Sequence, residues 1–344
     1  MNGGRRLVRA PLRGLSLLQV RHVSTVPFGA AAGDTARVYR ELERDFGVLA
    51  PPVALHAPVP ELLAASWTTL RETMLVGGRA DRITKEAVAA AVSAGNTCPF
   101  CTTVHGGLLD SLSRRPVGRR RSGPAGPAPA ALAAWVADGG EPPFGPELLP
   151  ELAGTALCLH YLNRMVNVFL GPQPLPPGAP ARALGPVLRV LVGLMRASAG
   201  TAAPGTSLSL LPPAALPPDL GWAAADPRIA AALGRSTAAV EQVAADLVPE
   251  PVRAVVGAAV DGWDGADPGL DRARLTAPLA GLDPGQRPVG ELALLTALAS
   301  YRVDERVLAA ARAAGAGDRE LLTTTAWASL RAARRRVGHL LDLD

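Results

Sequence analysis

Residues 82–110 read RITKEAVAAAVSAGNTCPFCTTVHGGLLD, and this stretch decides the fold. Its alanine-rich first part favours a helix over 82–94, because alanine is the strongest helix former. A glycine–asparagine pair then predicts a short turn. A second helix is expected over 97–110, with Thr97 as a good N-cap and Pro99 tolerated in the first turn. We therefore expect a pair of helices joined by a tight turn.

The second predicted helix carries three reactive side chains at helical spacing. Cys98 and Cys101 are three residues apart, and Cys101 and His105 are four apart, so the three share one stripe of the helix. Both sulfurs then lie near the positive end of the helix dipole, which favours the thiolate. Side chains three apart in a first turn are also close enough to form a disulfide with little movement. The pattern indicates redox chemistry at a cysteine pair.

A carboxylate on the first predicted helix completes this group. Glu86 lies nine residues before the turn, or roughly 13 Å along a helix axis, and His105 lies eight residues after Thr97, or roughly 12 Å. If the two helices pack antiparallel, these side chains come level. The carboxylate would then orient the imidazole, and the imidazole would take the proton of Cys101. A perpendicular crossing would separate them.

The spacing of these four residues, E-x11-C-x2-C-x3-H, resembles the alkylhydroperoxidase D (AhpD-like), carboxymuconolactone decarboxylase family. A wider resemblance to the helices of that family covers residues 40–170. It implies an all-helical, oligomeric protein in which Cys101 is the peroxidatic thiol and Cys98 the resolving thiol. His105 and Glu86 would activate Cys101. The resemblance also implies a peroxide substrate, no metal, haem or flavin cofactor, and a dithiol reductant such as a dihydrolipoyl group on a partner protein.

Other interpretations of the same side chains stay open. A Cys-Pro-Phe-Cys tetrad also occurs in glutaredoxins, but there it follows a β-strand, whereas an alanine-rich helix precedes it here. A zinc site could use the two cysteines, the histidine and the glutamate, with Cys158 and His160 as the only further pair. Buried structural cysteines would carry no chemistry. On the AhpD-like scaffold, the alternatives to a peroxidase are a decarboxylase-like or general disulfide oxidoreductase activity, or a redox sensor or scaffold without turnover.

A second group of polar side chains interrupts an otherwise apolar helix further along the chain. The group would line the substrate pocket, hold a subunit interface or form a satisfied polar face. Its members are His160, Tyr161, Asn163 and Arg164. Cys158 lies between two leucines of the same helix, so we expect it to be buried and inert.

The rest of the chain follows the same helical pattern. Further helices are expected over 60–76 and 148–170, and strand signals are nearly absent. We therefore expect an all-α fold. Proline-rich stretches predict loops or linkers at 111–130, 171–180 and 201–219.

A long-period repeat divides the chain into two parts. Residues 148–168 resemble 318–338 at a spacing of 170, and 83–98 resemble 248–263 at a spacing of 165. Trp263 stands where the first copy has a cysteine, so only the first part keeps the chemistry. We predict a basic, flexible N-terminal segment over residues 1–39 and an AhpD-like domain with the cysteine motif over 40–170. A proline-rich linker follows over 171–220, and a degenerate AhpD-like half over 221–344.

Composition excludes several classes of protein. Of the 344 residues 48% are hydrophobic, enough for a sizeable core, and three cysteines are too few for a disulfide-stapled secreted scaffold. The net charge is +5, but the arginine run within 114–121 has no interleaved aromatic residues, which argues against nucleic-acid binding. Residues 1–33 contain five arginines and no acid, as in an organellar transit peptide or a basic bacterial leader. No apolar stretch of about 20 residues predicts a membrane span, and we expect a cytoplasmic protein with reduced thiols.

Overall fold

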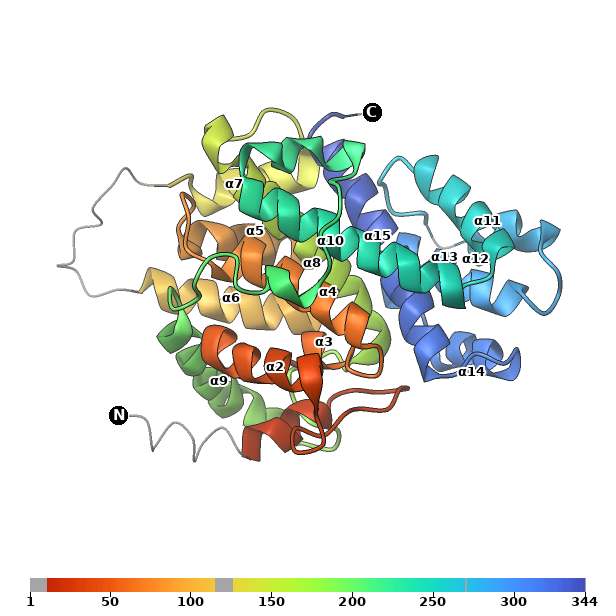
Figure 1. Ribbon diagram of the computed structural model, residues 1–344, viewed down its shortest axis with the longest axis horizontal. Helices are drawn as coiled ribbons and strands as arrows, with labels where there is room; N and C mark the ends of the chain where they lie inside the picture. Colours follow the sequence, from red (N-terminus) through yellow and green to blue (C-terminus); the bar gives the residue numbers. More distant parts are fainter. Residues whose placement is uncertain (1–10, 115–125, 270, 344) are drawn as a thin grey trace.

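The part of the chain that the structure describes is built from helices alone. The computed structural model describes residues 11–114, 126–269 and 271–343, and no strand occurs among them. The α-helices are α2 (Gly33–Glu41), α3 (Pro51–Ala54), α4 (Pro60–Leu70), α5 (Arg82–Gly95), α6 (Pro99–Ser113), α7 (Pro129–Asp138), α8 (Leu149–Phe169), α9 (Leu184–Ser198), α10 (Pro227–Leu247), α11 (Glu250–Asp261), α12 (Arg272–Thr276), α13 (Arg287–Ala299), α14 (Glu305–Ala313) and α15 (Asp318–Leu340). The all-α prediction is confirmed (Figure 1).

Shorter helical turns extend or join these helices. Two are π-helices, η1 (Leu42–Phe46) after α2 and η2 (Arg71–Leu75) after α4. The 3₁₀ helices are η3 (Pro146–Leu148), η4 (Ala181–Ala183), η5 (Leu208–Leu210), η6 (Pro218–Ala225), η7 (Ala277–Gly281) and η8 (Ser300–Arg302). The helices predicted over 60–76, 82–94 and 148–170 correspond to α4 with η2, to α5 and to α8.

Two long helices, α8 and α15, pack against each other at the centre of the molecule (Figure 1). A helix that is hydrophobic on every side is expected to be buried, and nearly all of α8 is buried. Thr155 and Ala156 of α8 are fully buried, and so are Thr325 and Ala326, their predicted repeat equivalents in α15. α4 and α10 form a second packed pair.

Similar groups of helices lie beside α8 and α15. α5 packs on α6 and α8, and α13 packs on α14 and α15. This arrangement favours two related halves in which α8 matches α15. In this arrangement α5 and α13 occupy similar positions, whereas the sequence repeat paired α5 with residues 248–263, which contain α11. The repeat at a spacing of 165 residues stays a prediction.

The N-terminal segment packs on the helical core over its described residues, instead of standing apart as a flexible leader. Tyr39 of α2 is fully buried. Arg13 donates two hydrogen bonds to Glu43, of 2.7 and 2.8 Å, and its guanidinium lies over the ring of Phe28. Residues 1–10, which carry three of the arginines that suggested a leader, lie outside the described part.

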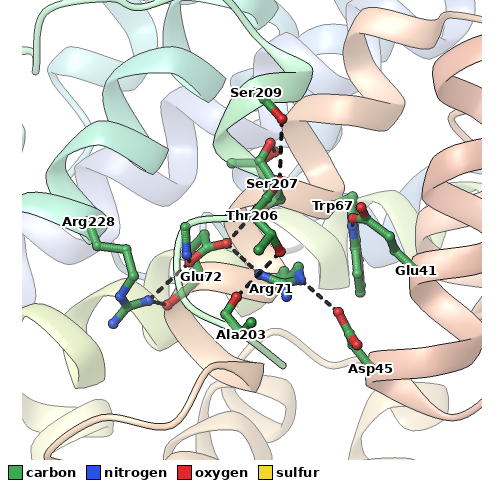
Figure 2. Close-up of polar contacts among 12 residues, drawn as sticks. Glu41, Asp45, Trp67, Arg71, Glu72, Ala203, Thr206, Ser207, Ser209 and Arg228 are labelled. Atoms are coloured by element: carbon green, nitrogen blue, oxygen red, sulfur yellow. Dashed lines mark hydrogen bonds and ion pairs between the residues drawn. The ribbon is translucent and has the colours of Figure 1, made fainter. Parts of the chain in front are cut away.

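The predicted linker over 171–220 also belongs to the packed structure. It contains α9, which packs on α6 and buries Met195. Further along, Ser207 donates to the carboxylate of Glu72 at 2.6 Å, and the backbone N–H of Gly205 donates to it at 2.9 Å (Figure 2). The chain between the halves is therefore tied to the first half by a buried acid.

A buried ion cluster surrounds this contact, as Figure 2 shows. Arg71 is fully buried, and it donates from Nε to Asp45 at 2.8 Å and from Nη1 to Glu72 at 2.7 Å. Arg228 of α10 reaches the backbone carbonyl of Glu72. Buried charges are stable only when paired and hydrogen-bonded, so the cluster fixes η1, η2 and α10 relative to one another.

The basic run was expected to form a solvated loop. Arg114 is exposed and donates to Asp110 at 2.8 Å, and residues 115–125 lie outside the described part. Within the described ranges, no helix combines the length and apolar character needed to cross a membrane.

Candidate active site

The Cys-x-x-Cys motif lies at the start of α6, in a tight hairpin with α5. Asp81 caps α5 by accepting a backbone N–H of its first turn. After α5 ends, Thr97 takes a φ of +50°, the left-handed backbone conformation that turns the chain. An N-cap residue has non-helical, extended-type φ and ψ, so Thr97 cannot serve. The N-cap is Cys98, one residue later than predicted, and Pro99 is the first helical residue.

Both motif cysteines are buried free thiols. Cys98 is 1% exposed and Cys101 is 4% exposed. Burial, together with the neighbouring Cys98, raises the pKa of Cys101 well above its ordinary value. The sequence predicted that the helix dipole would favour the thiolate, but burial and the neighbouring Cys98 outweigh the dipole. Cys101 is therefore a protonated thiol at rest, and it needs a base to become a nucleophile.

Glu86 and His105 meet across the hairpin, because α5 and α6 pack side by side with the two side chains level. Oε2 of Glu86 lies 2.7 Å from Nδ1 of His105, and Oε1 accepts Nε of Arg82 at 2.7 Å. Burial raises the pKa of Glu86, but Arg82 and His105 outweigh burial and hold it below its ordinary value. Glu86 is therefore charged. A hydrogen bond donated by Nδ1 leaves Nε2 of His105 free to accept a proton.

Cys101 and His105 lie one helical turn apart, and both line one cavity of about 300 Å³. Among the described residues, the wall has two further polar members, Ser16 and Gln19. The apolar wall comes from the N-terminal segment, the chain around α3, the end of α4, the stretch after α8, and helices α6, α8 and α9. It consists of Leu12, Leu15, Phe46, Val48, Ala50, Pro51, Pro52, Val53, Leu70, Phe100, Val104, Leu159, Leu162, Pro174, Pro176, Pro186, Val187, Val190, Leu191 and Met195.

The second predicted group of polar side chains lies away from this cavity, to which α8 contributes Leu159 and Leu162 instead. Each member is buried and hydrogen-bonded to another part of the chain. The partners are His56 for Tyr161, Ser93 for Asn163, and Asn96 for both His160 and Arg164. The group is a buried polar face of α8, and none of its members lines this cavity.

The sequence reasoning missed three contributors to this site. Arg82 is one turn before Glu86, and the i, i+4 rule for helix pairs could have found it. The leucines of the N-terminal segment and the wall from α9 reach the cavity from distant parts of the chain, one expected to be flexible and the other a linker. No local sequence signal points to them.

The third cysteine and the metal-binding alternative can be placed in the structure. Cys158 is fully buried in α8, and burial raises the pKa of its thiol. Among the described residues, no three His, Cys, Asp or Glu side chains are arranged to hold one metal ion.

Comparison with known proteins gives one informative relative. The curated protein named alkyl hydroperoxide reductase Rv2159c, from Mycobacterium tuberculosis (strain ATCC 25618 / H37Rv), is 37% identical to this chain over 329 residues. The alignment covers 92% of this chain and 93% of that protein. No family model matches the chain, and no solved structure matches it.

Proposed function

Because this chain belongs to the AhpD-like alkylhydroperoxidase family, we propose that it is a peroxidase whose working group is the Cys98–Cys101 pair. One observation carries the proposal. Cys101 and His105 open onto the same apolar cavity, while His105 is hydrogen-bonded to the buried, charged Glu86. A nucleophile, its base and the group that orients the base therefore stand beside a space that can hold a substrate.

The first chemical step is oxidation of Cys101. Nε2 of His105 takes the thiol proton, directly or through a water, and Glu86 stabilises the imidazolium that forms. The Cys101 sulfur then attacks the terminal oxygen of the hydroperoxide. The O–O bond breaks, the proton returns to the departing alkoxide, and an alcohol leaves. Cys101 has become a sulfenic acid, and the peroxide has taken two electrons.

The second step closes and reopens a disulfide. Cys98 lies within hydrogen-bonding reach of Cys101, so its sulfur can displace the sulfenic hydroxyl as water. An external dithiol, such as the dihydrolipoyl group of a partner protein, then reduces the disulfide by exchange and returns both thiols. The protein acts in this scheme as a homo-oligomer, as its family resemblance implies.

The cavity favours organic hydroperoxides over hydrogen peroxide. A water molecule occupies about 30 Å³ of liquid, and hydrogen peroxide is only slightly larger. A space of about 300 Å³ with an apolar wall is therefore much larger than hydrogen peroxide needs. The same space can bury an alkyl chain while its hydroperoxide end meets Cys101.

Serine variants of all three cysteines test the proposal. We expect Cys101→Ser to consume no hydroperoxide with dithiol present. Cys98→Ser should stop at a sulfenic acid that a dimedone probe traps, as shown by mass spectrometry. Cys158→Ser is the matched control, because this buried thiol lies outside the site, and it should turn over like the unaltered protein.

The outcome that contradicts the proposal is equally direct. Hydroperoxide consumption that persists in Cys101→Ser removes this cysteine from the reaction. A disulfide that forms in stoichiometric amounts, without turnover at any dithiol concentration, favours a redox sensor instead.

A further inference from the structure

A second, polar pocket lies between the two halves of the molecule, next to the cysteine turn. Its volume is about 80 Å³. The first half supplies the turn over 95–97 and Arg164 of α8. The second half supplies residue 263, residues 265–267 and 298–301, and Arg336 of α15. No step of the peroxidase scheme uses this pocket.

Two arginines line the pocket without a carboxylate partner. Arg164 is 4% exposed, and it donates from Nε to the carbonyl of Ala297 at 3.0 Å and from Nη1 to that of His160 at 2.7 Å. Arg336 donates to the carbonyl of Gly265. Among the described residues, neither guanidinium forms an ion pair with a carboxylate. Charged side chains are almost never buried in this way unless a counter-ion accompanies them.

The charged groups of the pocket also indicate an excess of positive charge. Burial and the neighbouring Arg336 lower the pKa of Arg164 to about 9, and burial lowers the pKa of Arg336. The one acid of the pocket wall, Asp267, is already occupied, because it accepts Tyr301 Oη at 2.6 Å and the N–H of Gly269 at 2.8 Å. Two cations against one engaged acid leave the pocket with an excess of positive charge.

We propose that this pocket binds a small oxyanion, a phosphate or carboxylate group, between Arg164 and Arg336. The planar guanidinium matches the oxygen pairs of both groups. A volume of about 80 Å³ gives room for a small group such as a phosphate or a carboxylate. The bound anion joins α8 to α15, and so it holds the two halves together beside the turn that carries Cys98.

Anion titrations of the full chain test this site. Thermal unfolding is followed at constant ionic strength while chloride is replaced by inorganic phosphate and, separately, by acetate. We expect the melting temperature to rise with the logarithm of anion concentration above the dissociation constant, by about 2–4 °C at ten times that constant for the preferred anion. A rise with only one of the two anions identifies the group that binds. Calorimetric titration of the same anion should give one site per chain.

Arginine variants locate the effect. Arg336→Met, which removes a half-buried side chain, should lose the rise in melting temperature, and Arg164→Met should do the same. The matched control is Arg319→Met, which removes the same charge from an exposed position of α15 outside the pocket and should keep the full rise. The proposal is overturned if neither anion raises the melting temperature of the unaltered protein, or if Arg336→Met responds like Arg319→Met. Both readouts are independent of peroxidase activity, so failure of one proposal leaves the other standing.

Discussion

The α5–α6 hairpin and the α13–α14 hairpin lie in matching places beside α8 and α15, but they begin their second helices differently. α14 begins at Asp304, whose carboxylate accepts the backbone N–H of Val307 at 3.0 Å. α6 begins at Cys98, which makes no side-chain capping bond. The second hairpin has a residue that stabilises a helix end, and the first has a thiol in its place. The difference indicates that the first hairpin gives up local stability for chemistry.

The positions that follow each cap extend this comparison. Three residues after the cap stand Cys101 in α6 and Val307 in α14, and one turn later stand His105 and Ala311. All four are buried. At the positions where the first hairpin has its reactive groups, the second hairpin therefore has buried apolar side chains. The apolar cavity also lies over the first hairpin alone, because none of its lining residues lies beyond Met195.

The largest expected effect is on the rate of Cys101 oxidation, when the buried acid of the first hairpin is changed. Glu86→Gln leaves the amide without the charge that stabilises the His105 imidazolium. We expect the rate of Cys101 oxidation by hydroperoxide to fall about 10²–10⁴-fold, the usual contribution of a positioned acid or base. Glu291→Gln on α13 is the matched control, since Glu291 pairs with Arg272 at 2.8 Å and does not line the cavity that holds Cys101. Single-turnover loss of thiol measures both rates, and equal rates for the two variants would remove Glu86 from the mechanism.

The cavity predicts a dependence on alkyl chain length. Each buried methylene contributes about 0.8 kcal/mol, or about fourfold in kcat/KM, until the chain fills the space. A series from ethyl to decyl hydroperoxide should therefore show a steep rise. Leu15→Glu, which places a charge in the cavity wall, should flatten it. Leu18→Glu in the same segment is the control, because both leucines are exposed but only Leu15 lines the cavity.

A series that is already flat in the unaltered protein would contradict the substrate preference but not the thiol chemistry. Equal slopes for Leu15→Glu and Leu18→Glu would show that the alkyl chain binds elsewhere.

The hairpin was predictable from sequence because its signals are local. Alanine content and the glycine–asparagine turn predicted two helices joined by a tight turn. The spacing of Glu86 and His105 predicted that the carboxylate would meet the imidazole if the helices packed antiparallel, and in the structure the two groups do meet. The N-cap was one residue off, because Thr97 takes a left-handed conformation that an N-cap does not adopt.

The cavity and the buried charges were not predictable in this way. The cavity wall joins chain segments that are far apart in sequence, and proline content made residues 171–220 look like a linker although α9 packs within them. The partners of Arg164 and of Arg71 are equally remote. Amphipathic patterns show that a side chain is buried, but they do not show which distant group it meets.

Acid should weaken the first hairpin through Glu86. The folded-state pKa of Glu86 lies below its ordinary value, so the unfolded chain takes up the proton first as pH falls. The stability that charged Glu86 contributes is complete above the ordinary glutamate pKa of about 4.3 and is lost as pH falls through the lower, folded value. Denaturant unfolding of Glu86→Gln should therefore lose less stability than the unaltered protein over that window. A parallel decline in both proteins would show that the Arg82 and His105 contacts do not hold this charge.

The smallest expected effect is on the free energy of unfolding when the two N-caps are changed. The two substitutions should change that free energy in opposite directions. Asp304→Ala removes a side-chain cap from α14, and we expect it to lower the free energy of unfolding by about 0.5–2 kcal/mol. Cys98→Ser gives α6 a hydroxyl that can accept the N–H of Cys101, so it should raise the free energy of unfolding by up to about 1 kcal/mol while it removes the resolving thiol. Urea unfolding of both variants under reducing conditions measures the pair. If Cys98→Ser were instead destabilised as much as Asp304→Ala, the thiol would be part of the packing of the hairpin, and the first half would have given up no stability for its chemistry.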